Sequence, residues 1–139
     1  MTLKMDIPAL GEFLQRTFPQ VADDFAVERL DTDTLTVRLR VTEQHLRPGG
    51  TVSGPSMFAL ADVAIYLAIL ARLGPVALAV TTNCSMDFMR KPEAGRDLLA
   101  ETRLLKMGRT LVVGDVLIRS EGMEAPVARA GLTYSIPPG

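Results

Sequence analysis

Apolar residues recur along the chain at two different spacings, and these spacings predict where its helices and strands lie. From Leu35 to Val41 every second residue is apolar, which predicts a strand with one buried face. From Pro8 to Phe18 the apolar residues recur at helical spacing instead, which predicts a short amphipathic helix. Further strands are expected over Phe25–Leu30, Ala77–Met89, Asp97–Lys106, Thr110–Arg119 and Ala125–Ile136.

The longest apolar stretch runs from Pro55 to about Leu73 and predicts a long buried helix. Proline suits the first turn of a helix, because the N–H that it lacks would have no partner there. Gly74-Pro75 is a typical helix stop. The preceding segment, Thr42–Gly54, contains several glycines and is expected to be a loop.

The order of these elements limits the fold to a short helix, two strands, one long helix and four strands. Turns at Asp31–Thr34, Lys106–Arg109 and Glu121–Glu124 are expected to join neighbouring strands as hairpins. A single apolar helix needs a sheet that curls around it. We therefore expect one α+β domain, residues 1–139, in which a curved antiparallel sheet wraps one long central helix. Residues 1–20 form a short N-terminal helical segment in this scheme.

Composition and charge narrow the classes of function. Hydrophobic residues make up 47% of the chain and charged residues 22%, as in globular proteins. The net charge of −1 argues against nucleic-acid binding, so an anionic ligand needs a local cluster of basic residues. The N-terminus lacks the apolar core of a signal peptide, and the long helix is slightly short for a membrane span and carries a charge. We therefore expect a cytoplasmic protein that binds no membrane.

The chain has one cysteine, Cys84, and one histidine, His45. A single cysteine excludes an intramolecular disulfide and a cysteine-based metal site. A single histidine without further ligands at metal-binding spacing gives no support for a metal centre. We expect both residues to be structural and no metal to be bound.

Asp62 is the only charged residue between Pro55 and Ala71. An ionised carboxylate in apolar surroundings costs several kcal/mol unless something stabilises it. Asp62 can pair with a basic residue such as Arg72, can bond a backbone group, or can lie at a partly wet interface and do chemistry. The residue pattern alone leaves these alternatives open.

The start of the helix offers a second chemical group. Small residues around Gly54 can expose backbone N–H groups at the positive end of the helix, where a developing oxyanion can be held. Gly54 and Asp62 are eight positions apart, so about 12 Å separates them along one helix. Two groups acting on one carbonyl must both lie within about 3 Å of it or of its attacking water. If both act together, the site must be shared between two protomers.

Three short motifs lie around the long helix: Gly50-Thr-Val-Ser-Gly-Pro55 before it, Leu60-Ala-Asp62 within it and Phe88-Met-Arg-Lys-Pro92 at the end of the next strand. They resemble those of the hotdog-fold acyl-CoA thioesterases, in particular the PaaI-like group of phenylacetate degradation. That family carries Gly-Thr-x-His-Gly-Gly, Leu-x-Asp and Phe-Leu-Arg-Pro at the corresponding places. The hairpin at 106–110 is also similar, and the resemblance extends from about residue 21 to residue 136.

The resemblance implies catalytic roles. Asp62 matches the helix carboxylate that serves as general base or nucleophile, and Gly54 matches the glycine whose N–H binds the thioester oxygen. In the family these two groups come from different protomers. A polar residue on the following strand often orients the water, and Thr81 is preferred over Thr82 for this role.

Three positions depart from the family pattern. Ser53 stands where the family has histidine, Pro55 replaces the second glycine, and Arg47 stands where asparagine is common. The resemblance implies that the family histidine and asparagine polarise or position the thioester. We therefore expect this site to hold its substrate differently at Ser53 and Arg47. Ser53 is not expected to act as a nucleophile, because nothing places His45 beside it.

Coenzyme A carries several phosphate charges, and a protein that binds it usually presents Lys or Arg side chains near one mouth. The candidates here are Arg90, Lys91, Lys106 and Arg109, with Arg47 and Arg72 behind them. The acyl pocket is expected to be lined by Met57, Phe58, Ala61, Ile65 and Phe88.

We therefore expect an acyl-CoA thioesterase that works as a homodimer or as a dimer of dimers, that is, a homotetramer. It needs no metal or redox cofactor, and coenzyme A enters only as part of the substrate. Two alternatives stay open on the same scaffold. One is a non-catalytic protein that binds acyl-CoA or fatty acid, and the other is a structural dimer in which Asp62 pairs with a base. A hotdog dehydratase is less favoured, because no histidine stands at the helix start.

Overall fold

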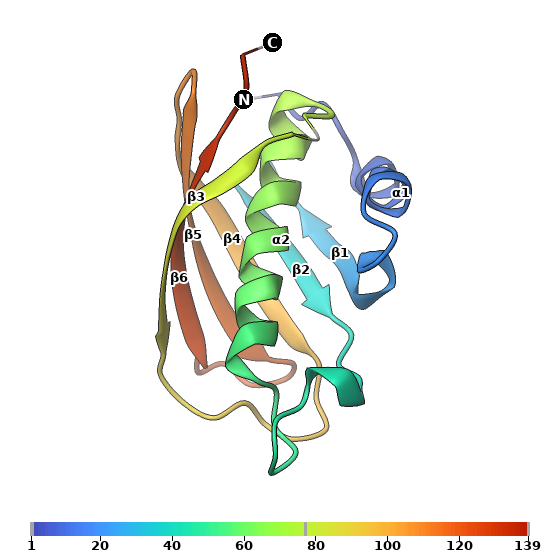
Figure 1. Cartoon of the computed structure of the whole chain (residues 1–139), viewed down its shortest axis with the longest axis vertical. Helices are drawn as coiled ribbons and strands as arrows, with labels where there is room; N and C mark the ends of the chain where they lie inside the picture. Colours follow the sequence, from blue (N-terminus) through green and yellow to red (C-terminus); the bar gives the residue numbers. More distant parts are fainter. Residues whose placement is uncertain (1, 77, 139) are drawn as a thin grey trace.

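The computed structural model describes residues 2–76 and 78–138 and shows the expected α+β domain (Figure 1). A short helix and two strands precede a long helix, and four strands follow it. The helices are α1 (Ile7–Thr17) and α2 (Gly54–Leu73), and the short 3-10 turns are η1 (Ala22–Asp24) and η2 (Glu43–His45). The strands are β1 (Phe25–Leu30), β2 (Thr34–Leu39), β3 (Val80–Phe88), β4 (Leu98–Met107), β5 (Leu111–Ser120) and β6 (Ala128–Ser135).

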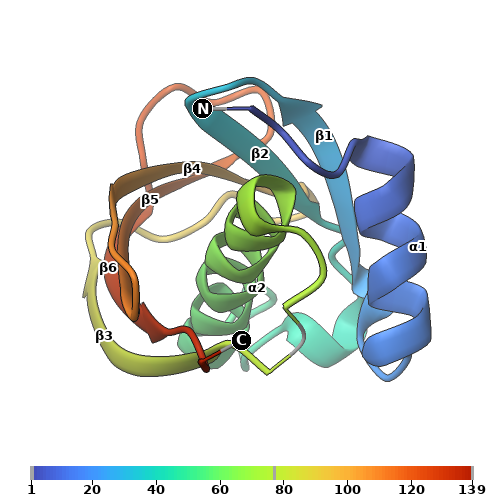
Figure 2. The same ribbon diagram turned by 90° about the horizontal axis from the view of Figure 1, so that it is seen from above.

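The six strands form one antiparallel sheet in the order β1-β2-β4-β5-β6-β3. The sheet curves around α2, which lies against its concave face, and α1 packs beside β1 (Figure 2). The two ends of the sheet are therefore β1, which α1 covers, and β3. The curved sheet around one central helix is the architecture that the residue pattern predicts.

Helix α2 is the core of the domain. Leu60, Ala64 and Ile69 on it have no exposed surface, and most of its other residues are also buried. Within the described residues, α2 alone has the length and hydropathy of a membrane span, but 67% of that apolar window is buried inside the domain. A helix that a sheet encloses must also be apolar on all its sides, as α2 is.

The element boundaries differ from the sequence-based expectations at a few places. β6 begins at Ala128 and not at Ala125, because Pro126 has no N–H to donate to a neighbouring strand. β3 begins at Val80, since Ala79 donates its N–H to Val76 in a turn. Ala77, the expected start of that strand, lies outside the described residues. The turns η1 and η2 are too short to have a hydrophobic period and were not expected.

The packing of β5 on α2 depends on a glycine. A Cβ placed on Gly114 would overlap the Cδ1 of Ile65 and would lie 3.1 Å from the Cδ2 of Leu104. Ile65 is fully buried and cannot move into solvent. Gly131, on the neighbouring strand β6, has nothing within 4 Å of the same position.

We expect Gly114→Ala to destabilise the fold by about 1–3 kcal/mol, because the added methyl group overpacks the core between β5 and α2. Gly131→Ala is the matched control and should leave the melting temperature unchanged or slightly higher. Thermal unfolding followed by circular dichroism measures both variants. Equal melting temperatures for the two variants would show that β5 does not rest on α2 in this way.

Candidate active site

Asp62 lies in the middle of α2, and its carboxylate is held by two hydroxyl groups. Thr81 Oγ1 donates a hydrogen bond to Asp62 Oδ1. The Tyr134 hydroxyl lies 2.8 Å from the same oxygen and 3.0 Å from the backbone carbonyl of Asp62. Among the residues that the structure describes, both hydrogen bonds to the carboxylate end on Oδ1 and neither ends on Oδ2.

The sheet brings these two hydroxyls together. Thr81 on β3 and Tyr134 on β6 are direct cross-strand partners, so their side chains lie on the same face. The register shifts between Thr81 and Asn83, which leaves Thr82 as the extra residue of a bulge. Thr82 Oγ1 donates to the Thr133 carbonyl and does not reach Asp62. Of the two threonines considered from the sequence, the structure thus brings Thr81 to the carboxylate.

Burial and the charge of Asp62 affect two neighbouring groups. Burial raises the pKa of the Tyr134 hydroxyl well above its usual value, and the negative charge of Asp62 raises it further. Tyr134 therefore keeps its proton and remains a hydrogen-bond donor. Burial and the same charge also raise the pKa of the Cys84 thiol, so this cysteine is a poor nucleophile.

Arg72 does not neutralise Asp62. Its guanidinium donates to the carbonyls of Ala68 at 3.0 Å, Thr32 at 2.8 Å and Asp31 at 3.3 Å. It is 4% exposed, and burial lowers its pKa. Arg72 therefore ties the end of α2 to the turn between β1 and β2, and an Asp62–Arg72 pair is not formed.

His45 caps the short turn η2, as expected for a structural residue. Its Nδ1 accepts the Thr42 backbone N–H at 2.9 Å, and its Nε2 lies 3.4 Å from Asp24 Oδ2. The Ser53 backbone N–H in turn donates to the His45 carbonyl at 2.8 Å. The histidine thus fixes the loop that leads into α2.

The start of α2 leaves one N–H available for a ligand. Ser53 is the N-cap, and its hydroxyl accepts the Ser56 N–H at 3.2 Å. Pro55 has no N–H, and the Met57 N–H bonds the Ser53 carbonyl. The Gly54 N–H stands in the first turn, where no carbonyl of the helix can accept it. Ser53 thus caps the helix and leaves the Gly54 N–H as the donor at its positive end.

A pocket of about 460 Å³ opens beside Gly54. Three of its lining residues, Arg47, Arg90 and Lys91, are basic, and none of those described is acidic. The lining is Arg47, Thr51, Val52, Gly54, Met57, Phe88, Met89, Arg90, Lys91 and Pro92. The pocket therefore combines a helix N-terminus with a positive rim, which suits an anionic ligand.

The other residues expected to bind substrate lie outside this pocket. Ala61 and Ile65, expected to line the acyl pocket, are fully buried in the core, and Phe58 is 40% exposed on the surface of α2. Lys106 lies near the end of β4, and Arg109 lies in the turn from β4 to β5. This turn is at the end of the molecule where α2 ends (Figure 1). The pocket of a single chain therefore gathers some of the expected binding residues, and the others lie elsewhere.

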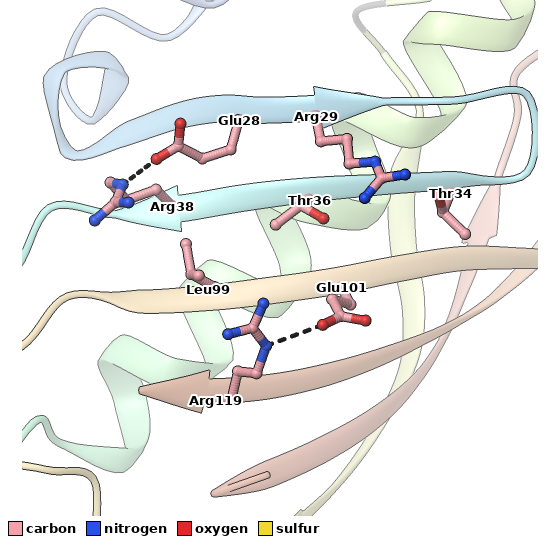
Figure 3. Close-up of a pocket in the computed structure, with 8 residues that line it drawn as sticks. All are labelled: Glu28, Arg29, Thr34, Thr36, Arg38, Leu99, Glu101 and Arg119. Atoms are coloured by element: carbon pink, nitrogen blue, oxygen red, sulfur yellow. Dashed lines mark hydrogen bonds and ion pairs between the residues drawn. The ribbon is translucent and has the colours of Figure 1, made fainter. Parts of the chain in front are cut away.

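A second hollow, of about 440 Å³, lies on the outer face of the sheet across β1, β2, β4 and β5 (Figure 3). Each of its three arginines, Arg29, Arg38 and Arg119, forms an ion pair with a nearby carboxylate. Arg38 donates to Glu28, and Arg119 Nε lies 2.9 Å from Glu101. The positive charges of this hollow are therefore paired with carboxylates beside them. The hollow lies on the other side of the sheet from Asp62.

Tyr134 was missed by sequence reasoning. The inward-facing residues of β6 before it, Ala128, Ala130 and Leu132, are all apolar. A tyrosine that continues such a series has a buried hydroxyl that needs a partner, and that is the signal that could have identified it.

Comparison with known proteins identifies relatives of the chain. A crystal structure of a "putative thioesterase" from Silicibacter sp. TM1040 shares 63% sequence identity, with a TM-score of 0.93 over 99% of this chain and 96% of that one. The N33D mutant of the phenylacetic acid degradation protein PaaI from Thermus thermophilus shares 29% identity, with a TM-score of 0.72 over 86% of this chain and 99% of that one. "Putative esterase PA0474" of Pseudomonas aeruginosa is 31% identical over 103 residues, which are 74% of this chain and 75% of that protein.

These likenesses agree with the motifs around Gly54 and Asp62 and with the sheet that wraps α2. The family model of the thioesterase superfamily matches residues 49–127, which include all of α2 and the strands β3 to β5. The chain therefore belongs to the thioesterase superfamily and has its hotdog fold.

Proposed function

We propose that the protein hydrolyses acyl-CoA thioesters, with Asp62 as the catalytic carboxylate and the Gly54 N–H as the oxyanion donor. The observation that carries this proposal is the carboxylate on the core helix, held by the hydroxyls of Thr81 and Tyr134 and by no cation in the described residues. A carboxylate that served only stability would be expected to pair with a base or to be replaced by an apolar residue. Membership of the thioesterase superfamily supports thioester hydrolysis as the reaction.

In the proposed reaction, Asp62 takes a proton from a water molecule while the water oxygen attacks the thioester carbonyl carbon. The carbonyl oxygen becomes an oxyanion and accepts the Gly54 N–H at the positive end of a helix. The tetrahedral intermediate then collapses, the carbon–sulfur bond breaks and coenzyme A leaves as the thiolate, which takes up the proton that Asp62 received from water. The products are a carboxylic acid and coenzyme A, and the chemistry needs no metal or redox cofactor. Direct attack by Asp62 is the other route that its position allows.

We propose that each site is shared by two protomers. Eight positions along α2 hold Asp62 and Gly54 about 12 Å apart, so they cannot act on one carbonyl within a single chain. Strand β3 is an open edge of the sheet and carries exposed apolar residues, including Val80 at 55% and Phe88 at 55%. Thr81 of this strand lies at Asp62, and the Phe88 ring lies at Gly54.

Antiparallel pairing of two β3 edges about a two-fold axis would therefore bring each Asp62 toward Gly54 of the partner subunit. The same contact would cover the exposed apolar residues of β3. This arrangement is a homodimer, and two such dimers would make the expected tetramer.

The pocket at Gly54 is the proposed entrance for coenzyme A. Arg47, Arg90 and Lys91 supply positive charge for its phosphates, while Met57 and Phe88 offer apolar surface to the rest of the ligand. Lys106 and Arg109 remain proposed phosphate ligands that would act from another protomer. The cytoplasm is the proposed location, because coenzyme A thioesters are substrates of intracellular metabolism.

A non-catalytic protein that binds acyl-CoA is the second candidate, because Ser53 replaces the family histidine. The two candidates predict the same binding and differ in turnover. The Gly54 N–H and the Asp62 carboxylate are both present, which favours the enzyme.

We expect Asp62→Asn to lower the hydrolysis rate at least about a hundredfold, because an amide cannot accept the proton from water. Release of free thiol from a panel of acyl-CoA thioesters measures the rate, and an acyl thioester without phosphates shows how much the coenzyme A moiety contributes. Acyl-CoA should still raise the melting temperature of the variant. Binding without turnover in the unmodified protein would establish the non-catalytic candidate instead. An unchanged rate in Asp62→Asn would show that Asp62 is not the catalytic carboxylate.

We expect Gly54→Pro to lower kcat by about a hundredfold to a thousandfold, because proline removes the N–H proposed to hold the oxyanion. Proline is well tolerated at the first helical position, and Ser53 before it has an extended conformation that a following proline accepts. Gly54→Ala is the matched control, since it adds a Cβ beside the Phe88 ring but keeps the N–H. Equal kcat values for the two variants would rule out the Gly54 N–H as the oxyanion donor.

A further inference from the structure

We infer that Tyr134 is a positioning residue that holds Asp62 by one oxygen, Oδ1, and leaves Oδ2 to take the proton from water. This inference rests on the proposed function and adds a residue from a strand outside the motifs that carry the family resemblance. It assigns different roles to the two oxygens of the carboxylate.

The contacts around Asp62 are asymmetric. Thr81 Oγ1 and the Tyr134 hydroxyl both approach Oδ1, and the hydroxyl also lies 3.0 Å from the backbone carbonyl of Asp62. A phenol that touches both the side chain and the backbone of one residue restricts rotation of that side chain. Hydrogen bonds donated to Oδ1 also draw charge from it, so the basic lone pairs of Oδ2 are those left for water.

Tyr134 is itself held rigidly. It is 3% exposed and lies on β6, which pairs with β5 on one side and with β3 on the other. Its ring stacks on Tyr66 with 6.4 Å between the ring centroids and an angle of 30° between the planes. A donor fixed in this way keeps Asp62 in one orientation through the reaction, as a catalytic group requires.

The chemical consequence concerns the first step of hydrolysis. Oδ2 accepts one proton of the attacking water, and the water oxygen forms the bond to the carbonyl carbon. The Tyr134 hydroxyl keeps its proton and stabilises the charge that stays on Oδ1 before the transfer. Without this donor the carboxylate can turn, and Oδ2 is then no longer aimed at the water.

A purely structural role would give the buried hydroxyl a partner and nothing more. The two roles differ in what they predict for Tyr134→Phe, which keeps the ring and its stacking on Tyr66. A structural role affects the melting temperature alone. A positioning role lowers kcat and leaves KM unchanged, because Tyr134 lies outside the pocket at Gly54.

The experiment measures kcat and KM for thiol release from an acyl-CoA that the unmodified protein hydrolyses, at a temperature where each variant is folded by circular dichroism. We expect Tyr134→Phe to lower kcat about tenfold to a hundredfold with KM unchanged, the range that a lost hydrogen bond to a charged group gives. Thr133→Val is the matched control, because it removes a hydroxyl from the same strand on the other face of the sheet. Unchanged kcat in Tyr134→Phe would overturn the inference.

A second variant covers the case in which Tyr134→Phe does not fold. 4-Fluorophenylalanine placed at position 134 fills the space of the hydroxyl with a fluorine that cannot donate a hydrogen bond, so it should lower kcat with KM unchanged. Unchanged kcat in this variant would also overturn the inference. The Asp62→Asn variant separates the two proposals. If it keeps full activity, the proposed function is refuted. If it is inactive while Tyr134→Phe is fully active, the positioning role alone is refuted.

Discussion

A carboxylate on a buried helix must replace the water it has lost with other hydrogen-bond donors, and in this chain that constraint falls on Asp62. Two hydroxyls from neighbouring strands meet it, Thr81 on β3 and Tyr134 on β6. Both reach Asp62 only because the sheet curves around α2 and because their strands pair in one register. The position of the carboxylate thus depends on the curvature of the whole sheet.

The enclosing sheet also decides where chemistry can take place. Most of α2 is buried, so its N-terminus and the open edge of the sheet at β3 are the two proposed approaches for a substrate. The pocket with its basic rim lies at the first of these, and Asp62 lies next to the second. The fixed rise of a helix keeps Gly54 and Asp62 apart in one chain. This separation is the physical argument for the proposal that two protomers make each site.

Much of the fold could be predicted from the sequence, because alternating strands such as β2 and the unbroken apolar run of α2 carry strong periodic signals. Asp62 and Gly54 could be chosen as candidate site residues from the sequence too, since Asp62 is a lone charge in that run and Gly54 stands at the helix start. Tyr134 and the bulge at Thr82 could not, because both depend on which residues of β3 and β6 face each other. Strand pairing across about fifty residues leaves no local pattern in the sequence. For the same reason, the sequence did not show that Arg47, Arg90 and Lys91 line one pocket. It also did not show that Lys106 and Arg109 belong to the β4–β5 hairpin, which lies at the other end of α2.

The central claim, that Asp62 of one protomer works with Gly54 of another, can be tested by mixing two inactive variants. Asp62→Asn and Gly54→Pro are unfolded together, refolded together and assayed for thiol release from an acyl-CoA that the unmodified protein hydrolyses. Random pairing makes about half of the dimers mixed, and each mixed dimer has one intact site of its two, so the shared-site account predicts about a quarter of the unmodified rate. A mixture that stays as inactive as its two parents would contradict it.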